Sequence, residues 1–427
     1  MSNGFSQTTA ILLRKSSAFI KYFVWYNYLM VSKAKTKSGH KKTRKNSKAN
    51  FFKKPFDSLS SSLLAIFIAL IILNIGIYVF TYTNQTFAAN FADNVLRPII
   101  GDKATIAIEA AFFKVEDSLN QIKYSFIKPN TASFVKSPYA NKKIAIKNVQ
   151  TFTLKNVPPF NNFPSLAGEG VWVPIYTGTS EAVMAKTFVR PDPKRSYAVT
   201  YLVKMNMNDL SLSAVAGIYQ PGGRAKPGLG KIPSSVQKTN NLIAAFNGGF
   251  QKKDGHYGMI VGNTTYLPLE KNLATLVIYK DAKPKIVDYT GQNLGQNVVA
   301  IRQNGPMLLE NSQDVTSSEA WNMQTWGLTT TDTMYTWRSG IGITKNGNLI
   351  YAAGPSLVPQ TLAAALKAAG AVNAMQLDIN PVWVRFVIFN SYGNGLYHYY
   401  SLTKDMTNGG YQYLTGYQKD FFYLVEK

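Results

Sequence analysis

Three short segments in the second half of the chain place polar side chains beside glycine or a turn, at the end of an apolar run. They are Asn-Gly-Gly-Phe at 247–250, Arg-Ser-Gly-Ile-Gly at 338–342 and Leu-Asp-Ile-Asn at 377–380. Ligand sites of sheet proteins are built from residues at strand ends, and glycine there lets a backbone approach a ligand closely. One such segment is common, but three in one region predict a functional site.

Asp378 and Arg338 carry the chemistry of two of these segments. The carboxylate of Asp378 follows an apolar strand directly, which suits a nucleophile, a general base, an acceptor for sugar hydroxyls or a metal ligand. A structural role is the alternative, because Asp-Ile-Asn-Pro at 378–381 is good turn chemistry. Arg338 has no obvious acidic partner nearby in sequence, so its guanidinium suits a phosphate or a carboxylate. A structural ion pair with a distant acid explains Arg338 about equally well.

Polar groups at two other strand ends complete the candidate site. The side chain of Asn247 and the amides of Gly248 and Gly249 form a candidate anion-binding nest. Arg302 and Asn304 precede Gly-Pro and make a second polar cluster, which a satisfied turn explains about as well. We include all five residues among the candidate catalytic or substrate-binding residues.

Three further side chains are weaker candidates for substrate contact. His256 lies in a glycine-rich loop and could act as an acid or base, although a surface histidine is the simpler interpretation. Asn380 and Trp383 follow Asp378, and an indole can stack on a sugar ring, although most large aromatic residues belong to the core.

The scarcity of cysteine and histidine limits the chemistry. The chain has no cysteine and three histidines, which excludes disulfides, thiolate zinc sites and cysteine nucleophiles and argues against a multi-histidine metal centre. No metal site and no cofactor are expected, although calcium or magnesium stays open because both bind oxygen ligands.

The N-terminal region predicts a membrane anchor. Residues 1–57 hold thirteen Lys or Arg against the single acid Asp57, so 12 of the 24 net positive charges lie in this tail. No charged residue occurs between Asp57 and Asp93, and residues 63–80 are almost purely apolar. Such a run spans the hydrocarbon core as a helix of roughly 27 Å. The basic flank then predicts a single-pass helix at 58–83, with a cytoplasmic N-terminus and an extracellular C-terminal domain.

Two alternatives compete with this interpretation of the N-terminal region. A cleaved signal peptide would use the small residues near 86–89, but the basic region is far too long for one. The basic tail resembles a nucleic-acid-binding segment, but orientation and attraction to anionic lipid explain it better. We therefore expect the membrane and anionic lipid as partners, and no nucleic acid.

The rest of the chain divides into a helical stalk at 84–127, a linker or extended arm at 128–170 and a large domain at 171–427. A dimerising helix and a helix packed on the main domain are alternatives to the stalk, and ordinary packing is the simplest of them. The stalk is expected to break at Arg97-Pro98, and proline and polar residues dominate the arm. Within the domain, hairpins are expected at 259–267, 273–289 and 341–353. A helix at 360–369 between the strands 349–353 and 373–378 predicts a βαβ-like unit. The fold class is therefore α+β, mainly antiparallel sheet preceded by one transmembrane helix.

Taken in order, these motifs resemble the phosphodiester glycosidase family, which includes the lysosomal uncovering enzyme. The resemblance covers about residues 185–390 and is carried by IAAFNGGF at 243–250, Arg-Gln-Asn-Gly-Pro at 302–306, the Arg-Ser strand at 338–347 and Leu-Asp at 377–378. It implies a glycosidase whose catalytic residues include Asn247, Arg338 and Asp378. The family usually continues Leu-Asp with a glycine-rich run, whereas this chain has Ile-Asn-Pro-Val-Trp at 379–383.

The sequence therefore predicts a membrane-anchored, extracytoplasmic hydrolase of sugar-phosphodiester linkages in an envelope glycopolymer or exopolysaccharide. The alternative is a non-catalytic module that binds anionic glycopolymer on a degenerate enzyme scaffold. The positive charge outside the tail suits an acidic ligand in both cases.

Overall fold

The computed structural model describes residues 91–427, with gaps at 136–143, 149–151, 161–162, 179–180, 224–225, 282, 317–325, 327–334 and 407–409, and the single residues 76, 84, 87 and 88. These residues all belong to one compact unit that begins at Asn74. The basic tail and nearly all of the predicted transmembrane helix lie outside the described residues. Among the described residues, no helix is long and apolar enough to cross a membrane.

The largest sheet has eight strands in the order β14-β13-β17-β15-β16-β5-β4-β2. Neighbouring strands all pair antiparallel. Their bounds are β2 (Val173–Pro174), β4 (Met184–Val189), β5 (Thr200–Met205), β13 (Met307–Glu310), β14 (Gln313–Asp314), β15 (Thr336–Thr344), β16 (Leu349–Leu357) and β17 (Ala371–Ile379).

Two sheets of five strands and one of two complete the strand inventory of the described residues. The first has the order β19-β18-β7-β20-β6, the second β11-β10-β12-β8-β9, and β1 pairs parallel with β3. Their bounds are β1 (Ala145–Ile146), β3 (Glu181–Ala182), β6 (Leu210–Val215), β7 (Leu242–Asn247), β8 (Met259–Val261), β9 (Thr264–Leu267), β10 (Leu273–Tyr279), β11 (Pro284–Tyr289), β12 (Val298–Asn304), β18 (Phe386–Gly393), β19 (Leu396–Ser401) and β20 (Phe421–Glu426).

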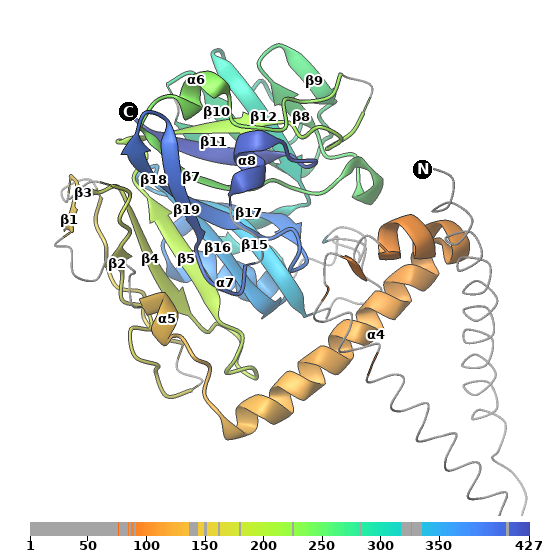
Figure 1. The fold of residues 1–427 in the computed structure, drawn as a ribbon. Helices are drawn as coiled ribbons and strands as arrows, with labels where there is room; N and C mark the ends of the chain where they lie inside the picture. The colour runs from red at the N-terminus through yellow and green to blue at the C-terminus, as the bar shows by residue number, and fades with distance from the viewer. Residues whose placement is uncertain are drawn as a thin grey trace, which may run out of the picture. The chain divides into compact units, whose positions relative to one another are not determined.

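The main core lies between the eight-stranded sheet and the two five-stranded sheets (Figure 1). Met375 of β17, Phe246 of β7 and Leu276 of β10 all belong to this core. The opposite face of the large sheet is covered by α7 (Pro359–Ala368), whose Leu362 packs in one cluster with Ala374 of β17. Both faces of the large sheet are therefore buried, which explains its long apolar strands.

The α+β class, the expected hairpins and the βαβ-like unit are confirmed. β8 and β9 turn at Gly262-Asn263, and β15 and β16 turn at Asn346-Gly347. β16 and β17 lie on either side of β15 and pair antiparallel with it, so they run parallel to each other and α7 connects them. Short helices occur at α5 (Ala132–Val135), α6 (Ser234–Gln237), η2 (Lys252–Asp254) and α8 (Tyr411–Thr415).

The described residues of the segment predicted as a stalk are helical, but the helix is not broken at Arg97-Pro98. η1 (Ala92–Leu96) leads directly into α4 (Arg97–Phe126), and the helical dihedral angles are interrupted at Gly101, where φ is +80°. Pro98 is tolerated in the first turn of a helix because the missing N–H needs no partner there. Glycine is the residue that adopts a positive φ without strain.

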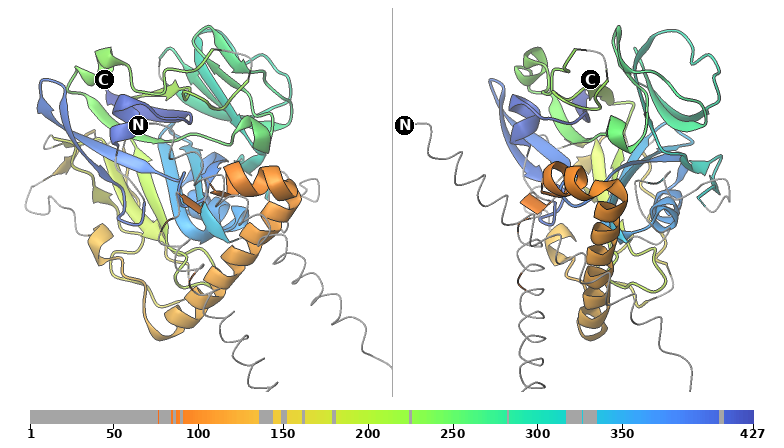
Figure 2. Two further views of the ribbon diagram at one scale, coloured as in Figure 1. Left: turned by 45° about the vertical axis from the view of Figure 1, so that its right-hand side comes forward. Right: turned by 90° about the vertical axis from the view of Figure 1, so that its right-hand side faces the viewer.

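α4 packs along the main domain (Figure 2). Arg195 pairs with Asp117 at 2.7 Å, and the rings of Tyr124 and Tyr197 stack with their centroids 5.1 Å apart. In the region predicted as an arm, residues 153–160 have no regular structure, and they bury Val157 against the face of the large sheet that α7 covers.

Candidate active site where three sheets meet

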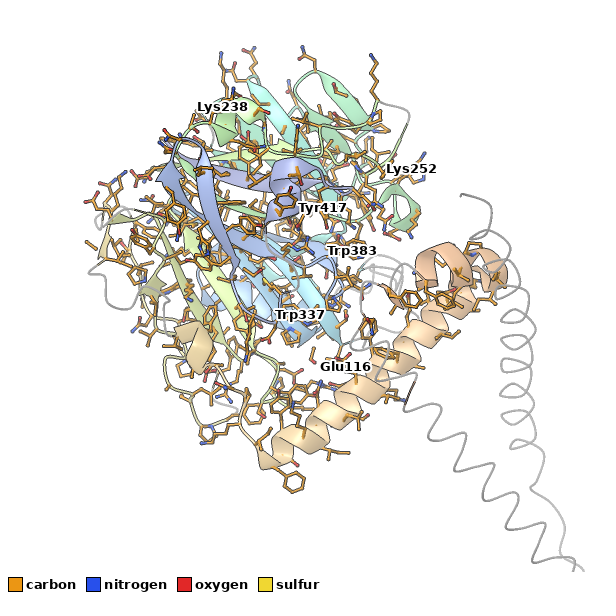
Figure 3. All side chains as sticks on the ribbon, in the orientation of Figure 1. Glu116, Lys238, Lys252, Trp337, Trp383 and Tyr417 are labelled. Atoms are coloured by element: carbon orange, nitrogen blue, oxygen red, sulfur yellow. The ribbon has the colours of Figure 1, made fainter. Side chains whose placement is uncertain are left out.

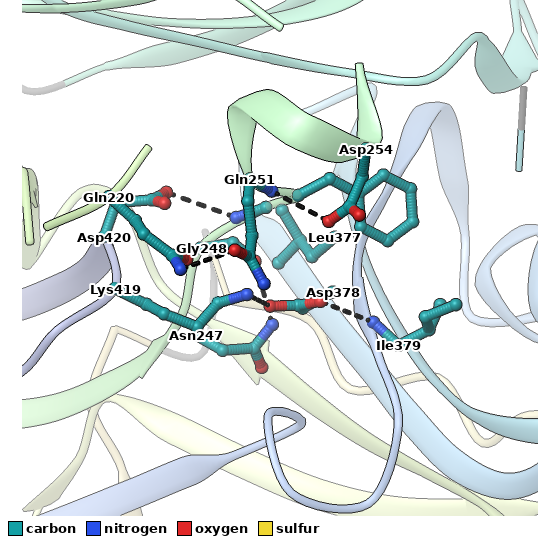
Figure 4. Close-up of polar contacts among 12 residues, drawn as sticks. Gln220, Asn247, Gly248, Gln251, Asp254, Leu377, Asp378, Ile379, Lys419 and Asp420 are labelled. Atoms are coloured by element: carbon teal, nitrogen blue, oxygen red, sulfur yellow. Dashed lines mark hydrogen bonds and ion pairs between the residues drawn. The ribbon is translucent and has the colours of Figure 1, made fainter. Parts of the chain in front are cut away.

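The candidate site lies where strand ends from three sheets converge (Figure 4). Asn247 ends β7, Asn304 ends β12 and Asp378 is the penultimate residue of β17. Lys419 arrives from the segment just before β20. The structure therefore brings Asn247, Asn304 and Asp378 together, as the sequence predicted, and adds a lysine.

Asp378 and Lys419 form a buried ion pair. Oδ2 of Asp378 lies 2.6 Å from Nζ of Lys419, and each residue is 3% exposed. The other carboxylate oxygen, Oδ1, accepts a hydrogen bond from the Ile379 amide at 3.0 Å. Because almost no water reaches the pair, its charges interact more strongly than charges at the surface.

Burial and neighbouring charges set the protonation of this pair. Burial raises the pKa of Asp378 to about 6, while the charge of Lys419 acts in the opposite direction. Burial lowers the pKa of the Lys419 ammonium, but Asp378 and its other anionic neighbours leave that pKa raised. A carboxyl group with a pKa near 6 can exchange a proton close to neutral pH, as a general acid or base must.

Asp254 of η2 is a second carboxylate in the same electrostatic environment. Burial raises the pKa of Asp254, with Lys419 acting in the opposite direction. The charge of Asp254 in turn contributes to the raised pKa of Asp378. Lys419 thus acts on two carboxylates at once, and such pairs perform acid–base work in hydrolases.

Trp383 and Asn380 shape the edge of the site. The Lys419 ammonium lies 4.8 Å from the centroid of the Trp383 ring, a cation–π contact. The turn that carries Trp383 begins at Asn380, whose φ is +80° and whose carbonyl accepts hydrogen bonds from the Trp383 and Val384 amides. Asparagine tolerates this conformation better than other non-glycine residues, so Asn380 supports the turn without a glycine.

Asn247 is a buried hydrogen-bonding centre, 2% exposed. Its Oδ1 accepts from the Tyr351 hydroxyl at 2.9 Å and from the Arg385 amide at 3.0 Å. Its Nδ2 donates to Oγ of Ser339, which donates to the Asp378 carbonyl at 2.8 Å. Asn247 therefore fixes the backbone that carries Asp378.

The glycine pair after Asn247 surrounds a carboxylate of the protein itself. The Gly249 amide donates to Oδ2 of Asp420 at 3.2 Å, and the Gly248 amide donates to the Asp420 carbonyl at 3.1 Å. A Cβ on Gly248 would lie 2.0 Å from Oδ2 of Asp420. The close approach of Asp420 is the physical reason for glycine at this position.

Arg302 and Asn304 support the same turn from β12. Arg302 pairs with Asp420, with Nε 2.8 Å from Oδ2, and also donates to the Phe250 carbonyl at 2.6 Å. Asn304 accepts from the Phe250 amide and donates to the Leu377 carbonyl, both at 2.9 Å. Asn304 therefore joins the glycine turn to the strand that ends at Asp378.

Arg338 faces a different part of the molecule. Its guanidinium donates to the Leu357 and Trp326 carbonyls and to the side chain of Gln376, at 2.9–3.1 Å. Successive residues of a strand point to opposite faces, and Ser339, the next residue of β15, points towards Asn247. Burial lowers the pKa of Arg338 to about 9, so the group stays charged at neutral pH.

His256 is exposed in the loop after η2. Within the described part of the chain, no group of three or more His, Asp or Glu side chains is arranged to hold a metal ion. Asp378 and Asp420 are instead paired with Lys419 and Arg302.

Lys419, Asp420 and Asp254 were not identified as site residues from the sequence. The first two stand at the entry of the apolar strand Phe-Phe-Tyr-Leu-Val at 421–425. The rule that singled out Asp378, a charged group at the end of an apolar strand, applies to them as well. Asp254 follows the Asn-Gly-Gly-Phe turn by four residues, but nothing in its sequence neighbourhood indicates burial.

Part of the domain that carries the site matches a known protein family. Residues 240–378 match the family model of the phosphodiester glycosidases, which confirms the resemblance seen in the motifs. The chain is therefore similar to this family over residues 240–378. The matched segment ends at Asp378, so the turn at 380–383 and Lys419 lie outside it.

The solved structures that match the chain are distant from it in both sequence and structure. The catalytic domain of zebrafish N-acetylglucosamine-1-phosphodiester alpha-N-acetylglucosaminidase, auto-inhibited by its pro-peptide, is 14% identical, with a TM-score of 0.36 over 60% of this chain and 87% of that one. A hypothetical protein from Synechocystis is 13% identical, with a TM-score of 0.31 over 57% and 62% of the two chains. No curated protein sequence matches the chain.

Proposed function

We propose that the domain hydrolyses a glycosyl phosphodiester, with Asp378 and Lys419 as the reacting pair. The observation that carries this proposal is the 2.6 Å ion pair of two buried residues at the end of β17. The raised pKa of Asp378, about 6, lets its carboxylate accept a proton near neutral pH. The family match over residues 240–378 supports the reaction class.

In the proposed reaction, the bond between the anomeric carbon and a phosphate oxygen breaks, and its electron pair stays on that oxygen. Water supplies hydroxide to the anomeric carbon, and its proton ends on the phosphate side. Asp378 would either take the proton from water or attack the anomeric carbon itself. The Lys419 ammonium would offset the negative charge of the departing phosphate. Asp254 is the second carboxyl group that glycoside hydrolysis uses in most families.

An anionic envelope glycopolymer is the proposed substrate class. Lys252 and Lys253 are exposed and directly precede Asp254 on η2, and the part of the chain after residue 57 keeps a net charge of 24 − 12 = +12. Trp383 is half-buried beside Lys419 and offers a ring for stacking on a sugar. In the view of Figure 3, Tyr417, Trp383 and Trp337 follow one another down the domain.

The cellular location is part of the proposal and is supported by the sequence alone. The apolar run at 58–83 would anchor the chain in the membrane, with the basic tail at the anionic cytoplasmic leaflet. The domain would then face the envelope. Protease added outside intact cells should cut the domain and spare the tail; the reverse pattern would contradict this topology.

The test of function is hydrolysis of N-acetylglucosamine-1-phosphodiesters and of extracted envelope polymer by the full chain. We expect sugar release that falls at least a hundredfold in Asp378→Asn, and a smaller loss in Lys419→Met. Asp281→Asn, which changes an exposed carboxylate at the turn between β10 and β11, is the matched control and should keep full activity. Polymer binding without sugar release would contradict the proposal and favour a non-catalytic binding module.

A further inference from the structure

α4 carries a row of apolar side chains on a face that the domain does not cover. Five members of the row are Ile108, Val115, Leu119, Ile122 and Phe126, exposed by 46%, 50%, 47%, 61% and 85%. The same helix is held to the domain from its other side, by Asp117 through Arg195 and by Tyr124 through Tyr197.

The spacing of this row is that of a helix that pairs with another helix. Successive members of the row are seven, four, three and four residues apart. Phe112 lies within the first interval, four residues after Ile108 and three before Val115. Alternating steps of three and four are the heptad pattern of coiled coils, which places every member on one seam. Asp117 and Tyr124 are seven residues apart and fall at the heptad position opposite the seam.

We propose that a second copy of this chain covers the seam, with two α4 helices packed antiparallel. The Asp117–Arg195 ion pair and the Tyr124–Tyr197 stack already hold α4 in place. Association therefore does not have to order the helix. The partner is a second copy because the apolar row of one α4 can pack against the same row of another α4.

The size of the seam fits a dimer. Burying its exposed apolar side chains on two copies would remove on the order of 1,000 Å² from water, which is about the minimum for a biological interface. Ala111, Ser118 and Ser125 flank the seam on one side. These small uncharged residues let two helices approach closely without repulsion between like charges.

The charges on the other flank favour the antiparallel arrangement. Glu109, Glu116 and Lys123 lie on this flank at intervals of seven residues. In an antiparallel pair, each Lys123 approaches the partner's Glu109, which also lies 3.3 Å from Arg97 of its own chain. Two opposite-charge contacts then form, one on each side of a contact between the two copies of Glu116. In a parallel pair, this flank faces the small residues of the other copy and gains no such contact. The antiparallel pair also sets Ile108 against the partner's Phe126.

Cross-linking of the full chain tests this geometry, because the natural chain has no cysteine. We expect a mixture of Ile108→Cys and Phe126→Cys chains to form mixed disulfides at least ten times more efficiently than either variant alone. Leu396→Cys, which introduces a thiol at an equally exposed apolar position of β19, is the control. Cross-linking of Phe126→Cys with itself would overturn the antiparallel arrangement. Cross-linking no stronger than that of Leu396→Cys would overturn the dimer.

Sedimentation of the full chain provides an independent measurement. The natural chain should sediment as a dimer at micromolar concentration, and Leu119→Glu should weaken dimerisation at least tenfold. Leu396→Glu should sediment like the natural chain. Since Leu119 is exposed, its replacement should leave thermal unfolding of the domain unchanged. A natural chain that sediments as a monomer throughout this range would overturn the proposal.

Discussion

The ammonium of Lys419 lies 2.6 Å from the carboxylate of Asp378, although the two residues are 41 positions apart in the chain. β17 delivers the carboxylate and the segment before β20 delivers the cation. Both residues are almost inaccessible to solvent. The pair therefore joins two layers of the fold and places a charged, proton-exchanging group at the centre of the candidate site.

Replacing Lys419 by Met leaves the Asp378 carboxylate buried without its cation. We expect the free energy of unfolding at pH 7 to fall by about 3 kcal/mol, as when one partner of a buried ion pair is removed. The double variant Lys419→Met/Asp378→Asn should lose less than the sum of the two single variants, because neither charge is then left unpaired. Urea unfolding of the natural chain, the two single variants and the double variant measures this coupling. Strictly additive losses would mean that the interaction between Asp378 and Lys419 contributes nothing to stability.

The pH dependence of hydrolysis reports the role of Asp378. Burial raises its pKa to about 6, and only the carboxylate form can accept a proton or attack carbon. We therefore expect kcat/KM to rise with pH through about 6 and to level off above it. Lys419→Met should move this rise to higher pH, because the cation no longer favours the carboxylate. A rate that falls through pH 6 would instead identify Asp378 as a general acid.

Local sequence patterns predicted much of the fold. Alternating and apolar runs predicted the bounds of β7 through β11 to within a residue or two. The alanine-rich residues before Gly370 predicted α7. These elements are decided by side-chain periodicity and turn chemistry, which are local. The order of strands within the sheets was not predictable in this way, because it depends on contacts between distant segments such as β20 with β6 and β7.

The candidate site was predictable only in part, for the same reason. Asp378 and Asn247 were identified because each ends an apolar strand. Lys419 also stands beside an apolar strand, but its pairing with Asp378 is a long-range contact that its neighbours in sequence do not reveal. The orientation of Arg338 depends on the side-chain alternation of β15, and its contacts with Leu357 and Trp326 could not be read from the motif around it.

Gly248→Ala tests the close approach of Asp420 to the glycine turn. The added Cβ would lie 2.0 Å from Oδ2 of Asp420, so the carboxylate or the backbone must move. We expect a loss of about 3 kcal/mol in the free energy of unfolding, typical of severe overpacking. Gly262→Ala is the control, because Gly262 has a φ of +56° and open space around it. Gly262→Ala should lower the free energy of unfolding by about 1–2 kcal/mol, because only the left-handed backbone opposes the new side chain. Thermal unfolding compares the two variants, and equal losses would contradict the steric argument.

Glu116 makes the packing of α4 dependent on pH. Burial raises its pKa to about 7, and the neighbouring charge of Asp117 adds to the rise. A carboxyl group whose pKa is higher in the folded state than its usual 4.5 opposes folding once it ionises. Stability should therefore fall as pH rises from about 4.5 to 7, by on the order of 2 kcal/mol. Glu116→Gln should abolish this loss in thermal unfolding between pH 5 and 8, whereas Glu310→Gln, an exposed position of β13, should retain it.

Asp117 acts in the opposite direction, because its hydrogen bonds with Arg195 and Tyr197 outweigh burial and lower its pKa, so its contribution is lost only in acid below about pH 4. An unchanged pH dependence in Glu116→Gln would show that Glu116 ionises in the folded protein as it does in the unfolded chain.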